Sequence, residues 1–86
     1  MSATTTYTGT TPNGTTVKRG TKTMPYTHAV WVELSASHWT VEAGRREVGT
    51  QSAISFHTRE DLAAKAAAKW AGDRDFAKVG VIAVTA

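Results

Sequence analysis

The clearest strand pattern in the sequence is Tyr26-Thr27-His28-Ala29-Val30-Trp31-Val32-Glu33-Leu34. Successive side chains of a strand point to opposite faces, so Val30, Val32 and Leu34 share one aliphatic face that should line the core. Trp31 then lies on the other face. A large aromatic side chain there is either covered by another element, such as an N-terminal hairpin or the C-terminal segment, or offered to a partner.

The next segment predicts a second strand, His38–Ala43, in which Trp39 and Val41 are the apolar residues of one face. A two-residue turn at Ala36-Ser37, or a four-residue one, keeps them on the core face of the preceding strand, because register follows the buried face. A weaker strand is expected within Glu47–His57. Its inward-facing residues should be Ile54 and Phe56.

Threonine dominates the N-terminal third and supplies eleven of the first 27 residues. Thr is β-branched and suits a pleated surface, so this composition favours strands. The segment Thr11-Pro12-Asn13-Gly14 predicts a turn, because Pro fixes φ and Asn-Gly tolerates positive φ. Its flanks, Thr4–Thr10 and Thr15–Lys22, are therefore expected to form a half-exposed or edge hairpin, with residues 1–4 frayed.

One helix is expected, beginning at Thr58-Arg59-Glu60-Asp61 and ending at Gly72. The Thr58 hydroxyl is placed to accept a hydrogen bond from the backbone N–H of Asp61, and the acidic residues suit the positive end of the helix. Gly72 suits a left-handed C-terminal position. Apolar residues recur every four positions and predict a stripe that faces the sheet: Leu62, Ala66 and Trp70.

The last segment, Val79–Val84, is apolar at both parities, which is typical of a strand buried on both faces. With Ser52–His57 and the helix it predicts a β-α-β crossover, the alternative being an antiparallel return. The expected fold class is therefore α+β in one domain of residues 1–86. A single, mostly antiparallel sheet of five to six strands, in the order β-β-β-β-β-α-β, should carry the Ala-rich helix on one face.

The formal net charge of +3 comes entirely from residues before Glu33, because seven basic and seven acidic residues cancel from there onward. If the first hairpin lies beside the central strands, its cations and those of the Arg45-Arg46 turn form one basic patch. Such a patch contacts phosphates and gives salt-dependent, sequence-independent affinity for nucleic acid. The alternative is that the lysines protect an edge strand from aggregation. The candidate patch comprises Lys18, Arg19, Lys22, Arg45 and Arg46.

No arrangement in the sequence matches a catalytic, cofactor or metal motif. The three histidines, His28, His38 and His57, have spacings of no compact zinc motif, and the chain has no cysteine. Neither Ser52 nor Ser55 stands in a Gly-x-Ser-x-Gly frame, and no Gly-rich phosphate loop precedes a helix. We therefore expect no enzymatic activity, no cofactor, no metal and no small-molecule substrate.

The longest apolar runs, Ala29–Val32 and Val81–Val84, are far shorter than the roughly 20 residues of a membrane span. Met1–Thr11 has no cationic start and no apolar core of a signal peptide. These features predict a cytoplasmic protein without a membrane partner.

Two stretches, Thr11-Pro12-Asn13-Gly14-Thr15-Thr16-Val17-Lys18-Arg19 and Tyr26-Thr27-His28-Ala29-Val30, resemble small uncharacterised accessory proteins of actinobacteria and their bacteriophages. The high Ala and Thr content agrees with this resemblance. It implies a cytoplasmic accessory factor acting on a host component, in the host cytoplasm if phage-encoded, and it brings no catalytic residues.

These observations predict a non-enzymatic module that acts by protein–protein contact with a host protein or with a second copy of itself. Trp is enriched at binding hot spots, so the expected interface is the solvent face around Trp31. The alternative is a nucleic-acid-binding accessory protein that uses the basic hairpin. The expected interface residues are Trp31, Ala29, Glu33 and Glu42.

Overall fold

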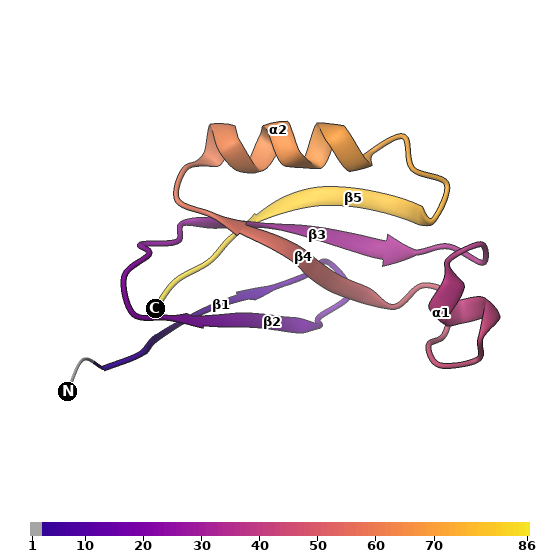
Figure 1. The fold of residues 1–86 in the computed structure, drawn as a ribbon, viewed down its shortest axis with the longest axis horizontal. Coiled ribbons are helices and arrows are strands. Elements are labelled where there is room, and N and C mark those ends of the chain that lie inside the picture. The colour runs from indigo at the N-terminus through magenta and orange to yellow at the C-terminus, as the bar shows by residue number, and fades with distance from the viewer. Residues whose placement is uncertain (1–2) are drawn as a thin grey trace.

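The computed structural model describes residues 3–86, so the expectation for residues 1–4 lies partly outside the described residues. The fold is α+β and forms three layers (Figure 1). Helix α2 covers one face of a three-stranded sheet, and a two-stranded hairpin lies on the other. The elements, in chain order, are β1 (Thr5–Thr10), β2 (Thr16–Thr21), β3 (His28–Leu34), α1 (Trp39–Glu42), β4 (Gln51–His57), α2 (Glu60–Trp70) and β5 (Phe76–Ala83).

The larger sheet has the strand order β4-β3-β5, with β3 antiparallel to both neighbours. Strands β4 and β5 are therefore parallel to each other, and α2 connects them across β3. The predicted β-α-β crossover is confirmed. Its two parallel strands, β4 and β5, are not adjacent, because β3 lies between them. The strand buried on both faces is β3, whereas Val79–Ile82 of β5 are half-buried at the sheet edge.

The N-terminal hairpin is confirmed, but it forms a sheet of its own, so the expectation of a single sheet is wrong. Its turn is closed by the N–H of Gly14, at φ 90°, which donates to the carbonyl of Thr11. The N–H of Asn13 donates to Oε1 of Gln51 at 3.1 Å and fixes the turn at the start of β4. The hairpin lies over the face of the central sheet opposite α2 and does not extend that sheet at its edge.

The C-terminal end of the chain links the two sheets. Thr8 and Thr85 exchange two backbone hydrogen bonds, the N–H of each donating to the carbonyl of the other at 2.8 and 3.0 Å. The segment after β5 thus leaves the larger sheet and pairs with β1. This pairing holds the hairpin over the β3 face.

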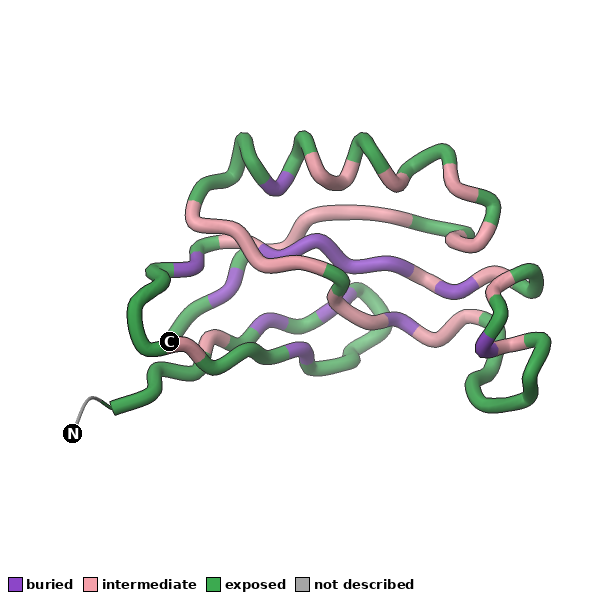
Figure 2. Tube along the Cα trace, viewed as in Figure 1, coloured by how far each residue is buried: buried purple, intermediate pink, exposed green. Residues whose placement is uncertain are grey.

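Burial is concentrated on β3, where four consecutive residues, Ala29 to Val32, are at most 8% exposed (Figure 2). Val30 and Val32 pair with Val81 and Val79 of β5 on the α2 side. On the other side, Ala29 forms a core cluster with Tyr26 and Val84, against which Tyr7, Phe56 and Ile82 pack. A helix on one face and a hairpin on the other therefore leave the central strand no solvent face.

Ile54 was expected to face inward, but a bulge in β4 places it at the surface. Val30 pairs with Ser55 but Trp31 pairs with Ala53, so Ile54 has no partner in β3. Its side chain is 38% exposed, whereas Phe56 is half-buried against the core cluster. One inserted residue breaks the simple alternation, so residues 54 and 56 do not behave as a pair.

The strand expected at His38–Ala43 is wrong, because the segment forms α1. Nδ1 of His38 accepts a hydrogen bond from the backbone N–H of Thr40 at 3.2 Å and caps the helix. Two glycines with positive φ, Gly44 and Gly49, then allow the chain to return to β4. Trp39, expected in the core, is 60% exposed as a result.

Helix α2 is present but differs in detail from the expectation. Arg59 is its N-cap and makes no side-chain cap hydrogen bond, so Thr58 does not have the predicted role. Gly72 does not have positive φ. The stripe that faces the sheet differs from the expected one at its start, because Leu62 is 38% exposed and Ala63 is fully buried. The stripe comprises buried Ala63 and half-buried Ala66, Ala67 and Trp70.

Across residues 3–86, neither helix has the length and hydrophobicity that a membrane span requires.

Candidate functional site

The structure places Trp31 in the interior, so the expected exposed tryptophan face is wrong. Trp31 is 8% exposed and Ala29 fully buried. A Cβ built on Gly80, the partner of Trp31 in β5, would lie 2.7 Å from the indole Nε1, so the ring packs directly over this glycine. The N-terminal hairpin covers this face. Of the two alternatives that the sequence allowed, Trp31 is thus covered by another element of the chain.

The two acidic residues of the expected interface are separated from that face and from each other. Glu33 is half-buried and accepts a hydrogen bond from Nε2 of Gln51 at 3.0 Å. Glu42 is exposed on α1. The structure therefore does not bring Trp31, Ala29, Glu33 and Glu42 together on one exposed surface.

The residues of the expected basic patch lie on two elements, the N-terminal hairpin and the loop after α1. Lys18 and Lys22 are exposed along the hairpin, and the guanidinium of Arg19 lies over the Tyr26 ring, 5.6 Å from its centroid. Arg45 and Arg46 follow α1, which lies at the end opposite the start of the hairpin (Figure 1). Arg19 is thus engaged with an aromatic ring, and Arg45 lies over Trp39.

The histidines are also dispersed. His28 lies opposite His57 in the sheet, with its Nε2 3.2 Å from a carboxylate oxygen of Glu60. Nε2 of His57 is 2.8 Å from the Ser55 hydroxyl. Within residues 3–86, no group of three or more His, Cys, Asp or Glu residues is arranged to hold a metal.

An exposed ion pair marks the start of α2. Two nitrogens of Arg59 donate to the carboxylate of Asp61, at 2.9 and 2.7 Å. These hydrogen bonds lower the pKa of Asp61 and raise the pKa of Arg59. The pair belongs to the surface, because both side chains are about two-thirds exposed.

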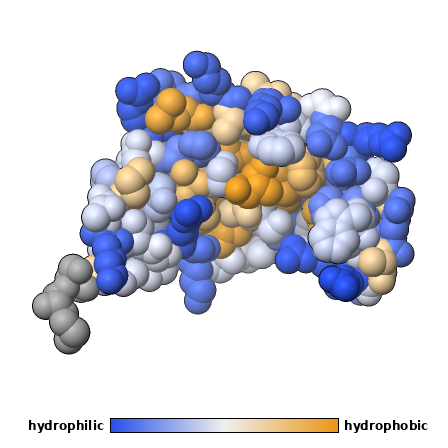
Figure 3. Space-filling view, viewed as in Figure 1, coloured by the Kyte–Doolittle hydropathy of each residue, from blue (hydrophilic) through white to orange (hydrophobic). Residues whose placement is uncertain are grey.

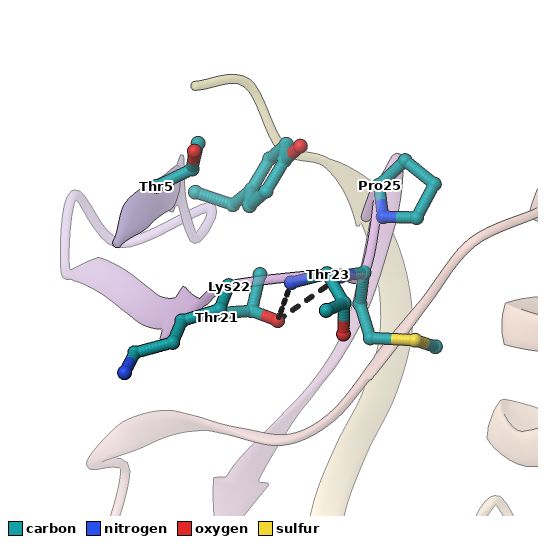
Figure 4. A pocket seen from close by; sticks show the side chains of 7 residues that line it. Thr5, Thr21, Lys22, Thr23 and Pro25 are labelled. Carbon is teal, nitrogen blue, oxygen red and sulfur yellow. Dashed lines mark hydrogen bonds between the residues drawn. The ribbon is translucent and has the colours of Figure 1, made fainter. Parts of the chain in front are cut away.

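One small hollow, of about 110 Å³, opens at the N-terminal end of the hairpin (Figure 4). The Thr21 hydroxyl accepts hydrogen bonds there from the backbone N–H groups of Thr23 and Met24. Four of the seven lining residues carry a hydroxyl group, and Lys22 is the charged one among them. The lining residues are Thr5, Tyr7, Thr21, Lys22, Thr23, Met24 and Pro25.

The strongest candidate site lies at the opposite end, where four rings contact one another. His38 stacks on Trp39 with 6.1 Å between centroids and lies 5.8 Å from Phe76. Phe76 in turn makes an edge contact with Trp70 at 5.9 Å. We call these four residues the aromatic strip. It joins α1, the end of α2 and the start of β5.

A cation lies over each end of the aromatic strip. The guanidinium of Arg45 is 5.7 Å from the Trp39 centroid, and Nζ of Lys69 is 5.5 Å from the Trp70 centroid. Such cation–π contacts are worth about 0.5–1 kcal/mol at exposed sites. Trp39 nevertheless remains 60% exposed, whereas His38, Trp70 and Phe76 are half-buried. The strip therefore presents the Trp39 ring to solvent.

Hydrogen bonds between two loops hold the aromatic strip in place. The hydroxyls of Ser35 and Ser37 both donate to the Arg74 carbonyl, at 2.6 and 2.7 Å, and the N–H of Ser35 donates to the Asp75 carbonyl. The loop before α1 is thereby fixed to the loop before β5. The His38 cap then sets the first residue of α1, which is Trp39.

The charges around the aromatic strip cancel. Figure 3 shows neutral and hydrophobic surface at the α1 end, bordered by hydrophilic residues. Four basic and four acidic residues belong to α1, the end of α2 and the loops that follow them. They are Arg45, Arg46, Lys69 and Arg74, and Glu42, Glu47, Asp73 and Asp75.

The aromatic strip escaped the sequence-based expectations because Trp39 alternates with Val41 as it would in a strand. Two local signals favoured the helix: His38 two residues before Thr40, which forms the cap, and Gly44 and Gly49, which allow the return. Comparison with protein-family models, curated proteins and solved structures gives no match.

Proposed function

We propose that this protein is a non-enzymatic binding module that contacts a protein partner through the aromatic strip. The observation that carries the proposal is Trp39, which is 60% exposed yet contacts the His38 ring and the Arg45 guanidinium. The His38 ring in turn contacts Phe76 of β5. Trp and Arg are the residue types most enriched at binding hot spots. A surface already held in one geometry loses less conformational entropy when it binds.

The composition of the aromatic strip favours protein over nucleic acid. A single-stranded nucleic acid needs free ring faces for base stacking and an excess of positive charge for the phosphates. Here Arg45 lies over Trp39, Lys69 lies over Trp70, and the surrounding charges cancel. An apolar centre with a mixed polar rim is typical of a protein–protein interface.

The resemblance to accessory proteins of actinobacteria and their phages agrees with this function. It suggests that the partner is a host protein and that the encounter takes place in the host cytoplasm. The proposal needs no cofactor, since recognition by packing and polar contacts requires none.

Nucleic-acid binding is the second candidate, favoured by the charge of the N-terminal third. Lys18, Arg19 and Lys22 precede the first acidic residue, Glu33, so their charge is uncompensated along the chain. Only phosphate contacts would be available to them, and affinity would fall steeply with salt. Because Arg19 lies over Tyr26, this surface offers fewer extended cations than the sequence suggested.

The test is quantitative capture of proteins from an actinobacterial lysate by the wild-type chain, Trp39→Ala and Met24→Ala. Met24 is the matched control, because it is 44% exposed and lies at the other end of the molecule, beside the hydroxyl-lined hollow. Loss of a hot-spot side chain should weaken capture by about 30-fold in the Trp39 variant. Capture by the Met24 variant should match the wild type, and nuclease should have no effect.

Equal capture by the wild type and Trp39→Ala would contradict the protein-interface proposal. Capture that nuclease abolishes, and that Lys18→Ala and Lys22→Ala weaken, would instead favour the nucleic-acid candidate.

A further inference from the structure

Helix α1 begins with a side-chain cap that depends on the protonation state of His38. Nδ1 of His38 lies 3.2 Å from the backbone nitrogen of Thr40. Within residues 3–86, the N–H of Thr40 has no other hydrogen-bond partner. Because an amide N–H can only donate, Nδ1 accepts and carries no proton. The capping ring is therefore neutral, with its proton on Nε2.

The side chain of Thr40 depends on the same nitrogen. Oγ1 of Thr40 is 2.7 Å from Nδ1 of His38, and the hydroxyl donates because Nδ1 holds no proton. Thr40 is buried, with 8% of its surface exposed. A buried donor that loses its acceptor costs the full desolvation of that group. Protonation of Nδ1 would leave the N–H of Thr40 without an acceptor and set two donors against each other.

The surroundings of His38 do not compensate for a charged ring. Across residues 3–86, no ion pair includes His38, and the dipole of a helix opposes a cation at its first turn. The Trp39 and Phe76 rings attract a cation, but they do not supply the acceptor that Thr40 would lose. The charged residues on the neighbouring elements are three acids and four bases. They are Glu42, Asp73 and Asp75, and Arg45, Lys69, Arg74 and Lys78.

We propose that His38 makes the aromatic strip pH-sensitive: α1 is closed while His38 is neutral and opens when acid protonates Nδ1. Histidine is the side chain that ordinarily changes charge between about pH 5 and 8. Loss of an N-cap acceptor shifts a helix equilibrium by about fivefold. Trp39 is the first residue of α1, so opening of the helix releases it from the strip. This regulation rests on the proposed function, because it concerns the same surface.

Two substitutions of His38 separate the cap from the ring contacts. His38→Asn and His38→Ala both remove the imidazole and its contacts with Trp39 and Phe76. Asn supplies a side-chain oxygen that accepts at an N-cap at any pH between 5 and 8, whereas Ala supplies none. His57→Asn controls for titration of another histidine, because His57 belongs to β4 and its Nε2 contacts the Ser55 hydroxyl.

The first measurement is the Cα chemical shifts of residues 39–42 by nuclear magnetic resonance at pH 7.5 and pH 5.5, which report the helix without any partner. In the wild type and His57→Asn, the open form of α1 should increase about fivefold at pH 5.5. His38→Asn should keep its helical shifts at both pH values, and His38→Ala should show reduced shifts at both. Wild-type shifts that do not change with pH, or a loss that His38→Asn shares, would overturn the proposal.

The second measurement is partner capture by the same chains at the two pH values. The wild type should capture its partner more weakly at pH 5.5, by as much as about fivefold, because only closed α1 is competent to bind. His38→Asn should capture equally at both pH values, and a wild-type loss no larger than that of His38→Asn would overturn the regulation. Trp39→Ala at pH 7.5 tests the proposed function alone. If that variant captures like the wild type while α1 still opens in acid, the proposed function fails and the His38 cap stands.

Discussion

Trp31 and Trp39 lie eight residues apart in the chain and have opposite environments. Trp31 is 8% exposed between the central sheet and the hairpin, and Trp39 is 60% exposed on α1. The first is covered by an element distant in sequence, and the second is turned outward by a local cap. The comparison shows that the role of an aromatic residue here depends on which layer covers it, more than on its place in an alternating pattern.

The largest effect should come from removing the buried tryptophan. Trp31→Ala deletes a ring that fills the space between β3, Gly80 and the hairpin, and should lower the free energy of unfolding by about 3–5 kcal/mol. Urea unfolding followed by circular dichroism measures this loss. A variant within about 1 kcal/mol of the wild type would show that the hairpin does not bury Trp31.

A smaller loss is expected at the glycine beneath the same ring. Gly80→Ala places a Cβ within 2.9 Å of three indole atoms, so the buried ring must shift, at a cost of about 1–3 kcal/mol. Gly72→Ala is the matched control, because a Cβ there meets nothing within 4 Å and the residue lacks positive φ. Equal stability of the two variants would contradict the close packing of Trp31 on Gly80.

Removal of the exposed tryptophan should affect partner binding and leave stability almost unchanged. Trp39→Ala should change the free energy of unfolding by less than about 1 kcal/mol, since exposed side chains contribute little to folding. The same variant should capture its partner about 30-fold more weakly. A melting temperature that falls as far as that of Trp31→Ala would show that Trp39 belongs to the core.

The smallest effect is expected at the surface pair of α2. The Arg59 hydrogen bonds lower the pKa of Asp61, so the pair stabilises the fold above the ordinary Asp pKa of about 3.9 and loses its effect as pH falls through the lowered value. Asp61→Asn should therefore melt slightly below the wild type at neutral pH. The two melting curves should converge in acid, and a difference that grows on acidification would contradict this assignment.

The parts of the fold that followed from the sequence are those where one local pattern dominates. The Thr11-Pro12-Asn13-Gly14 turn, the strand β3 and the alanine-rich helix are all present. In each, turn chemistry, strand period or helix period is reinforced by the tertiary contacts. Val30, Val32 and Leu34 were for this reason placed correctly in the core.

The remainder depends on contacts that no local pattern encodes. The hairpin packs over Trp31 through a bond from Asn13 to Gln51 and the pairing of Thr8 with Thr85, each between distant segments. The bulge at Ile54 inserts a residue without any Gly or Pro to signal it. The aromatic strip is formed by residues of α1, α2 and β5, which are distant in the sequence. A sequence pattern that predicts a strand at His38–Ala43 therefore does not indicate it.

The most direct test of this account is acrylamide quenching of tryptophan fluorescence in Trp70→Phe and in Trp39→Phe with Trp70→Phe. The first variant retains Trp31 and Trp39, and the second retains Trp31 alone. We predict that adding Trp39→Phe removes the readily quenched emission and leaves a blue-shifted signal that acrylamide scarcely affects. Emission from Trp31 alone that is quenched as readily as in the urea-unfolded chain would contradict the buried Trp31 and exposed Trp39 on which the account rests.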